Sequence, residues 1–304
     1  MKNFTIYTVS MLLALIVFVG TGEWMARQVN NSYKVKQSWM DHHAEEAEVL
    51  VFGNSHAYYG VRPNEFKSIA FNMAEPSQTL QMDAYLFLRD STRYKRLDAV
   101  LTTLSYTSMY TTELENGPEW HRCIYYKLYN HVPDHSIFSK YGWEFCFWHF
   151  YKGKIDAYLG ESEHLPCDEY GFGLDHQLEF KTQFDKDTSI VNEALRREII
   201  KTGKITQENI DALRRIASFC QKKKIRFILI TAPVSKQFYE GIWMPQKNLN
   251  TKIIQNLMKE YSCVKYGDYM MDARFEYDDF YDCTHLSPQG ATKFSKILSE
   301  DFDL

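Results

Sequence analysis

The sequence has little that points to metal or nucleic-acid chemistry. Its six cysteines form no Cys-x-x-Cys pair and stand at no spacing from histidine that suggests a zinc site. The formal net charge is -4, which leaves no basic footprint for nucleic acid. No internal repeat or low-complexity tract is evident. We therefore expect no metal, no other cofactor and no nucleic-acid partner.

Extreme composition is also absent. Apolar residues make up 45% of the chain and charged residues 24%, an ordinary globular balance that argues against disorder. A chain of 304 residues can bury a full core, as one large domain or two small ones. Aromatic residues reach 15% and are concentrated in the middle third, which sets that part of the chain apart.

The N-terminus lacks an Ala-x-Ala cleavage site but has a long apolar run, from Phe4 to Gly20. Such a run exceeds the apolar part of a signal peptide, about 7–15 residues, and lies at the short edge of a spanning helix, about 17–25 residues. We expect residues 1–25 to be a signal anchor, with a cleaved signal peptide as the alternative, and residues 26–45 to be a polar stalk. The remainder would then be exported and held at the periplasmic or extracellular side of a membrane, or secreted if the signal is cleaved.

Strand-like and helix-like segments alternate along much of the chain. Short apolar runs predict buried strands at residues 48–52, 69–73, 98–104, 225–231 and 263–266. Helical periodicity and capping residues predict helices at 78–89, 207–222, 248–261 and 288–298. This alternation predicts an α/β fold with a five-stranded parallel sheet covered on both faces, and reactive groups gather at the carboxyl ends of such strands.

The block at about 106–203 breaks the alternation. It contains Trp120, Trp143 and Trp148 with many tyrosines, glycines and prolines. We interpret it as an aromatic-rich insertion over the sheet. Its rings either stack on sugar rings or form a lid that packs on itself.

Two short motifs carry the residue types of serine-based acyl transfer. Gly53-Asn54-Ser55-His56 directly follows the first predicted strand, where a serine after a turning glycine is exposed. Near the other end, Asp282-Cys283-Thr284-His285 precedes a predicted helix. A serine needs a base to become a nucleophile, and an acid beside the histidine orients that base. The sequence therefore predicts a Ser55, His285 and Asp282 triad, with His56 either touching the substrate or closing the turn.

Together the two motifs resemble the first and last blocks of the SGNH (GDSL-like) hydrolase superfamily, the last block being Asp-x-x-His-Leu-[Ser/Thr]. The resemblance covers about residues 46–105 and 205–304. It implies a three-layer α/β/α sandwich related to flavodoxin over residues 46–304, and an esterase, lipase, deacetylase or O-acyltransferase activity. More loosely, the N-terminal anchor and weak middle blocks are similar to membrane-associated members that modify surface glycans. An acylated glycan or a small ester is the implied substrate.

The chain departs from that family where the oxyanion hole is built. The second-block region, Phe71 to Gln78, lacks the family's glycine, and the third-block region, Leu104 to Ser108, lacks its asparagine. Losing one oxyanion donor typically costs about 10²–10³ in turnover. The candidate oxyanion or substrate-binding residues are Asn54, Ser77, Gln78 and Ser105. A catalytically degenerate glycan-binding or scaffold protein on the same frame is the alternative.

Overall fold

The computed structural model describes residues 2–110, 114, 119–133, 142–144, 166–176, 181–200 and 206–304. Its centre is a sheet of five parallel strands in the order β2-β1-β3-β4-β5. The strands are β1 (Val49–Phe52), β2 (Ala70–Asn72), β3 (Ala99–Thr103), β4 (Arg226–Thr231) and β5 (Val264–Asp268). Each coincides with a segment predicted from an apolar run, and only β5 extends beyond its predicted end. The predicted five-stranded parallel sheet is confirmed.

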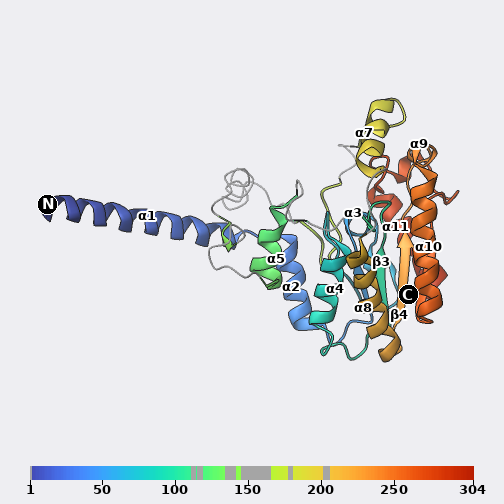
Figure 1. The fold of residues 1–304 in the computed structure, drawn as a ribbon, viewed down its shortest axis with the longest axis horizontal. Helices are drawn as coiled ribbons and strands as arrows, with labels where there is room; N and C mark the ends of the chain where they lie inside the picture. Colours follow the sequence, from blue (N-terminus) through green and yellow to red (C-terminus); the bar gives the residue numbers. More distant parts are fainter. Residues whose placement is uncertain are drawn as a thin grey trace.

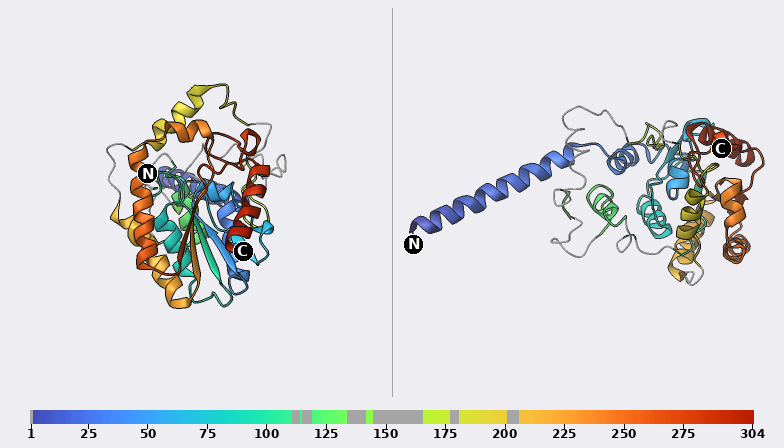
Figure 2. Two further views of the ribbon diagram at one scale, coloured as in Figure 1. Left: turned by 90° about the vertical axis from the view of Figure 1, so that its right-hand side faces the viewer. Right: turned by 90° about the horizontal axis from the view of Figure 1, so that it is seen from above.

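Helices cover both faces of the sheet, so the domain has three layers (Figures 1 and 2). The short helix α3 (Ser55–Tyr58) and α11 (Pro288–Phe302) pack on one face. Helices α4 (Leu80–Arg89), α8 (Gln207–Lys223) and α10 (Met244–Glu260) pack on the other. Successive residues of each strand point to opposite faces, and both faces are buried, which explains why the strands are apolar throughout.

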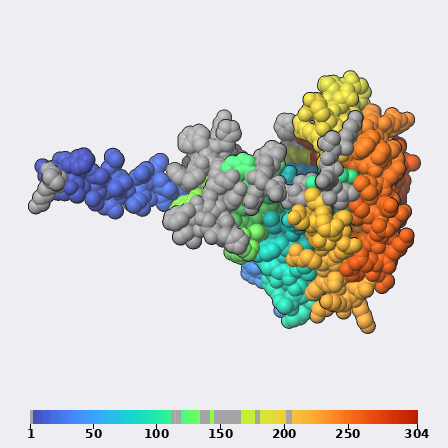
Figure 3. Space-filling model, in the orientation of Figure 1, coloured from blue at the N-terminus to red at the C-terminus, as the bar shows by residue number. Residues whose placement is uncertain are grey.

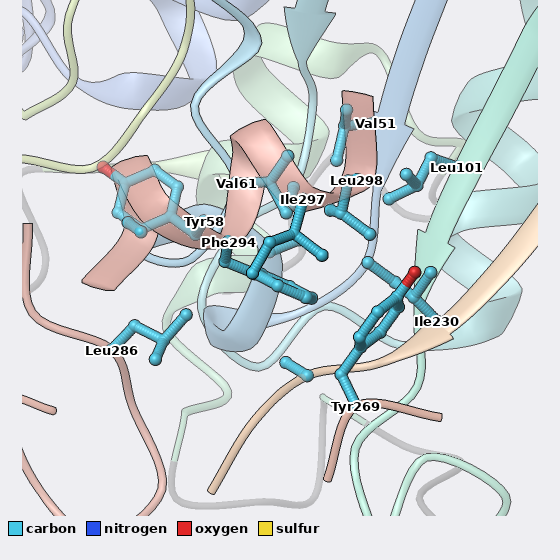
Figure 4. Packing of buried hydrophobic residues seen from close by; sticks show 14 of the residues in the cluster. Val51, Tyr58, Val61, Leu101, Ile230, Tyr269, Leu286, Phe294, Ile297 and Leu298 are labelled. Carbon is cyan, nitrogen blue, oxygen red and sulfur yellow. The ribbon is translucent and has the colours of Figure 1, made fainter. Parts of the chain in front are cut away.

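The core beneath α11 also holds the segments that carry the two sequence motifs. Phe294 and Leu298 of α11 belong to the same buried cluster as Tyr58 and Leu286 (Figure 4). Tyr58 lies in the helix that begins at the motif serine, and Leu286 directly follows the motif histidine. One core therefore anchors two segments that lie far apart in the sequence.

Helix boundaries follow local capping chemistry. Ser287 caps α11, because its Oγ accepts from the Gly290 N–H at 3.2 Å, and Thr79 caps α4 through the Met82 N–H at 3.3 Å. Helix α10 begins at Met244, before the predicted start at residue 248, with a proline in its first turn. The shorter helical elements are η1 (Pro63–Glu65), α9 (Lys236–Gly241) and η5 (Tyr277–Asp279).

Helix α1 (Lys2–Gln28) projects away from the rest of the molecule (Figures 1 and 3). Within it, Asn3–Gln28 is long and apolar enough to cross a membrane, by length and composition, and none of its apolar window is buried in the protein. A buried core helix is therefore not its role. The helix fits a membrane anchor or a signal sequence.

The segment after α1 differs from the predicted polar stalk at residues 26–45. Within it, Ser32–His43 forms helix α2, which packs on the α4 side of the domain. Tyr33, Lys36 and Met40 are each 3% exposed or less. The polar sequence predicted a solvent-exposed stalk, but Lys36 is buried in an ion pair, with its Nζ 3.4 Å from the Glu75 carboxylate.

The predicted insertion at about 106–203 lies partly outside the described residues, and Trp148 is among those outside. The described parts include α5 (Arg122–Asn130) and α7 (Thr188–Glu198). Residues 166–176 run along the β2 edge, where the Asn72 N–H donates to the Tyr170 carbonyl at 2.9 Å. The interpretation of the whole block as an aromatic lid stays a prediction.

Candidate active site

Ser55 stands at the carboxyl end of β1, one turn beyond the sheet. Gly53 has a φ of +124°, and a Cβ there would lie 2.1 Å from Oγ1 of Thr103, so only glycine fits the turn. Asn54 then caps α3, with its Oδ1 accepting from the His56 N–H at 3.1 Å. The side-chain oxygen of Asn54 is thus occupied by this cap, and Ser55 is the first residue of the helix.

His285 and Asp282 lie in the loop between η5 and α11. Oδ1 of Asp282 accepts from the backbone N–H groups of Thr284 at 2.7 Å and His285 at 2.8 Å, which folds the four-residue motif into a tight turn. The imidazole Nδ1 lies 2.9 Å from Oδ2 of Asp282. Its Nε2 lies 2.8 Å from Oγ of Ser55. The three predicted residues are therefore brought together in one hydrogen-bonded chain.

The electrostatic interactions between His285 and Asp282 suit His285 to act as a base. Burial alone would lower the pKa of His285, but the charge and hydrogen bond of Asp282, helped by Glu198, raise it above its ordinary value. Burial would raise the pKa of Asp282, yet the His285 charge and the hydrogen bonds to its carboxylate hold it well below its usual range. Asp282 stays ionised and can support an imidazolium.

Two further histidines pack against the imidazole. His56 stacks on His285 with ring centroids 4.9 Å apart, and His176 meets it edge-on at 5.3 Å. His176 is itself sandwiched between Tyr59 at 3.5 Å and Tyr281 at 4.0 Å. Burial, followed by repulsion from His285, lowers the pKa of both His56 and His176 to about 3. Both rings are neutral at ordinary pH and serve as aromatic walls around the base.

The sequence left two roles open for His56, contact with the substrate or closure of the turn, and both stay predictions. His56 lines the same cavity as Ser55 while also stacking on His285. His176 was not identified from the sequence, because it comes from the insertion and belongs to no recognisable motif.

Ser77 occupies the glycine-like position of the loop between β2 and α4. Its φ is +60°, in the left-handed region that glycine adopts without strain. The backbone N–H groups of Ser77 and Ser55 donate to no residue that the structure describes, although both residues line the cavity. These two N–H groups are therefore candidate donors to an oxyanion in the cavity.

The side-chain amide of Gln78 does not fit the predicted oxyanion role. Its Nε2 donates to Oδ1 of Asp83 at 2.6 Å and to the Met73 carbonyl at 3.4 Å, and its Oε1 accepts from the Tyr126 hydroxyl at 2.7 Å. Both ends of the amide are occupied, so Gln78 holds the loop in place. Its Asp83 partner is buried, which raises the pKa of that carboxyl to about 7.

Ser105 borders the cavity within a cluster of hydroxyl groups. Its Oγ lies 3.0 Å from Oγ of Ser108 and 3.3 Å from Oγ1 of Thr107. Thr107 in turn donates to Oε2 of Glu198 at 3.1 Å. The hydroxyl that was predicted as an oxyanion donor is thus part of a polar network on the cavity wall.

A cavity of about 240 Å³ lies over these groups. It is lined by Asn54, Ser55, His56, Ser77, Gln78, Thr79, Leu80, Ser105, Thr107, Ser108, Leu114, Glu119, Glu198 and His285. All the predicted site residues except Asp282 are in this set, and Asp282 supports His285 from behind. Glu119 and Glu198 were not identified from the sequence, since single acids in the insertion carry no pattern. Within the described ranges, no group of three or more His, Cys, Asp or Glu side chains is placed to hold a metal ion.

Comparisons with known proteins give no family for the chain. No family model matches it, and no curated protein matches it. One solved structure that is similar comes from Streptococcus pneumonia and is provisionally described as a platelet activating factor. It is 12% identical with a TM-score of 0.45, and the match covers 96% of this chain and 98% of that chain. The likeness is too distant to assign a function, so the function is argued from the residues of this chain.

Proposed function

We propose that this chain is an exported, membrane-anchored serine enzyme of the SGNH type, which hydrolyses or transfers acyl groups on a surface or secreted glycan. The observation that carries the proposal is the hydrogen-bonded chain from Ser55 through His285 to Asp282. The backbone N–H groups of Ser55 and Ser77, on the same cavity, have no acceptor among the described residues. This combination supplies a nucleophile, a base, an orienting acid and two oxyanion donors.

The first half-reaction forms an acyl-serine. Oγ of Ser55 attacks the ester carbonyl while Nε2 of His285 takes its proton, and the two N–H groups stabilise the oxyanion. As the tetrahedral intermediate collapses, His285 gives that proton to the leaving alcohol. Asp282 keeps the imidazole oriented and offsets its positive charge throughout.

The second half-reaction frees the serine. Water or a sugar hydroxyl attacks the acyl-serine, with His285 as the base, and the proton then returns to Oγ of Ser55. Water gives hydrolysis, and the sugar hydroxyl gives O-acyl transfer. Which of the two prevails depends on how well the bound acceptor excludes water.

The membrane part of the proposal depends on α1. None of its 18-residue apolar window is buried inside the protein, and a bilayer would cover it. Only residues 29–31 separate α1 from the packed helix α2, so the catalytic domain would sit close to the bilayer. A reporter joined after residue 31 tests export, and reporter activity confined to the cytoplasm would overturn this part.

Acetate release tests the chemistry. Full-length protein in detergent is assayed with p-nitrophenyl acetate and with an acetylated polysaccharide, beside Ser55→Ala and His285→Ala. We expect both variants to lose activity by about 10³-fold or more, because the triad acts as a unit. Activity that is unchanged in both variants would overturn the proposal. A glycan that binds without turnover would instead favour a degenerate binding protein.

A further inference from the structure

Glu198 brings a carboxylate into the catalytic cavity from a distant part of the chain. It is the last residue of α7, which lies beyond the carboxyl ends of the strands (Figure 1). The same cavity is lined by Ser55 and His285. Helix stability does not explain an acid at this position, because a negative charge at a helix C-terminus is disfavoured by about 0.3–1 kcal/mol.

The backbone around Glu198 is firmly held. The buried side chain of Gln246 on α10 donates from Nε2 to the Glu198 carbonyl at 3.1 Å and accepts from the Ile200 N–H at 2.9 Å. Thr107 donates to Oε2 of Glu198 at 3.1 Å. The carboxylate is thus oriented before any substrate arrives, and preorganised groups bind at lower cost.

One oxygen of this carboxylate is left for a ligand. Oε1 of Glu198 has no hydrogen-bond partner among the described residues, and the side chain forms no ion pair with them. Glu119, the other acid of the cavity, differs because Nε of Arg122 lies 2.7 Å from its carboxylate. Burial raises the pKa of Glu198 despite the opposing effects of the Thr107 hydrogen bond and of the His285 and Arg197 charges.

We propose that Glu198 forms a cation subsite, which binds a protonated amino group on the substrate next to the bond that Ser55 attacks. The proposal rests on the proposed acyl-ester function and specifies its substrate class. The cavity lining contains the carboxylates of Glu119 and Glu198 and no lysine or arginine among the described residues, which favours a cationic over an anionic substrate. An ammonium group would place a positive charge beside the Glu198 carboxylate and donate a hydrogen bond to Oε1.

Isosteric ester pairs test the subsite in the full-length protein in detergent. For the acyl side, p-nitrophenyl glycinate is compared with p-nitrophenyl propanoate, which replaces the ammonium by a methyl group. For the alcohol side, 2-aminoethyl acetate is compared with propyl acetate, which again replaces the ammonium by a methyl group. We expect kcat/KM to favour the charged ester of one pair by about tenfold, the effect of one charge-assisted hydrogen bond. Glu198→Gln should lower the charged-to-neutral ratio of kcat/KM by about tenfold.

The matched control is Glu193→Gln, an acid on the exposed surface of α7 that pairs with Arg196 and Arg197. It should keep the preference. Equal losses for charged and neutral esters in Glu198→Gln, or no preference in the wild type, would overturn the subsite.

Binding to the Ser55→Ala protein separates this proposal from the proposed reaction. By calorimetry, the charged ester should bind about tenfold more tightly than its neutral partner, and Ser55→Ala/Glu198→Gln should lose the difference. Selective binding without any turnover in the wild type would support the subsite and overturn the proposed enzymatic function. Equal binding of both esters would remove the subsite.

Discussion

Nζ of Lys36 lies 4.3 Å from the ring centroid of Tyr58, which joins α2 to the short helix that begins at Ser55. The same ammonium group donates to the Ala74 carbonyl and lies 3.4 Å from the Glu75 carboxylate, which also accepts from Ser32 at 2.9 Å. Residues that follow α1 are therefore tied, inside the core, to both the short helix that begins at Ser55 and the loop that leads to Ser77. The buried pair connects α2 to the candidate active site.

Replacing Lys36 by Met should destabilise the protein strongly, because it leaves the Glu75 carboxylate buried without its counter-charge. We expect a loss of about 3–5 kcal/mol in the free energy of unfolding, measured by urea denaturation. Lys36→Met/Glu75→Leu should recover much of that loss, since it removes both charges. Lys95→Ala breaks an exposed pair with Glu45 and should cost below about 1 kcal/mol. Equal effects of Lys36→Met and Lys95→Ala would contradict this account.

Substitutions at Ser77 should separate backbone conformation from side-chain chemistry. Because its φ is +60°, Ser77→Gly removes strain and keeps the N–H in place. We expect Ser77→Gly to retain esterase activity within about threefold, whereas the β-branched Ser77→Val should displace the N–H and lower kcat by about 10²–10³. Both are measured with p-nitrophenyl acetate. A large loss in Ser77→Gly would show that the hydroxyl, not the backbone, is what matters.

The sheet could be predicted because strands buried on both faces must be apolar, and each such run was bounded by polar or turning residues. The two turns that bring Ser55 and His285 together could be predicted for a related reason. The Gly53 turn and the Asp282 turn each impose a local residue pattern that survives in a single sequence. Local constraints of this kind are readable without a structure.

Groups whose roles depend on distant partners could not be predicted. The sequence predicted the Gln78 amide as an oxyanion donor, but in the structure it is hydrogen-bonded to Asp83 and Tyr126. The polar sequence of α2 suggested a stalk because the Glu75 partner of its lysine lies far along the chain. Glu198 belongs to the insertion, where no pattern marks an acid for a pocket.

The rate of the proposed reaction should rise with pH as His285 loses its proton, because only the neutral imidazole accepts the Ser55 proton. Since Asp282 raises the pKa of His285, the midpoint of kcat/KM should lie above about 6.5. Asp282→Asn removes that charge, so the midpoint should move to lower pH while activity falls by about 10⁴. The profile is measured with p-nitrophenyl acetate between pH 5 and 9. A midpoint that rises in Asp282→Asn would be inconsistent with this coupling.

His176 should make the fold sensitive to acid. Its pKa is about 3 in the folded protein, because burial and His285 disfavour its charged form, whereas an unfolded histidine titrates near about 6.5. Between these values the unfolded state binds the extra proton, so stability is full above about pH 6.5 and falls as the pH drops toward 3. The expected slope is about 1.4 kcal/mol per pH unit for this one group.

Urea unfolding at pH 7, 6, 5 and 4 measures that slope in the wild type and in His176→Phe. Phenylalanine keeps the stacking between Tyr59 and Tyr281 but cannot bind a proton. The slope of the unfolding free energy against pH should therefore fall by about 1.4 kcal/mol per pH unit. His42→Phe is the matched control, because His42 is exposed on α2 and should leave the slope unchanged. If His176→Phe and the wild type lose stability in parallel, His176 already carries its proton in the folded state and is not a neutral ring beside His285.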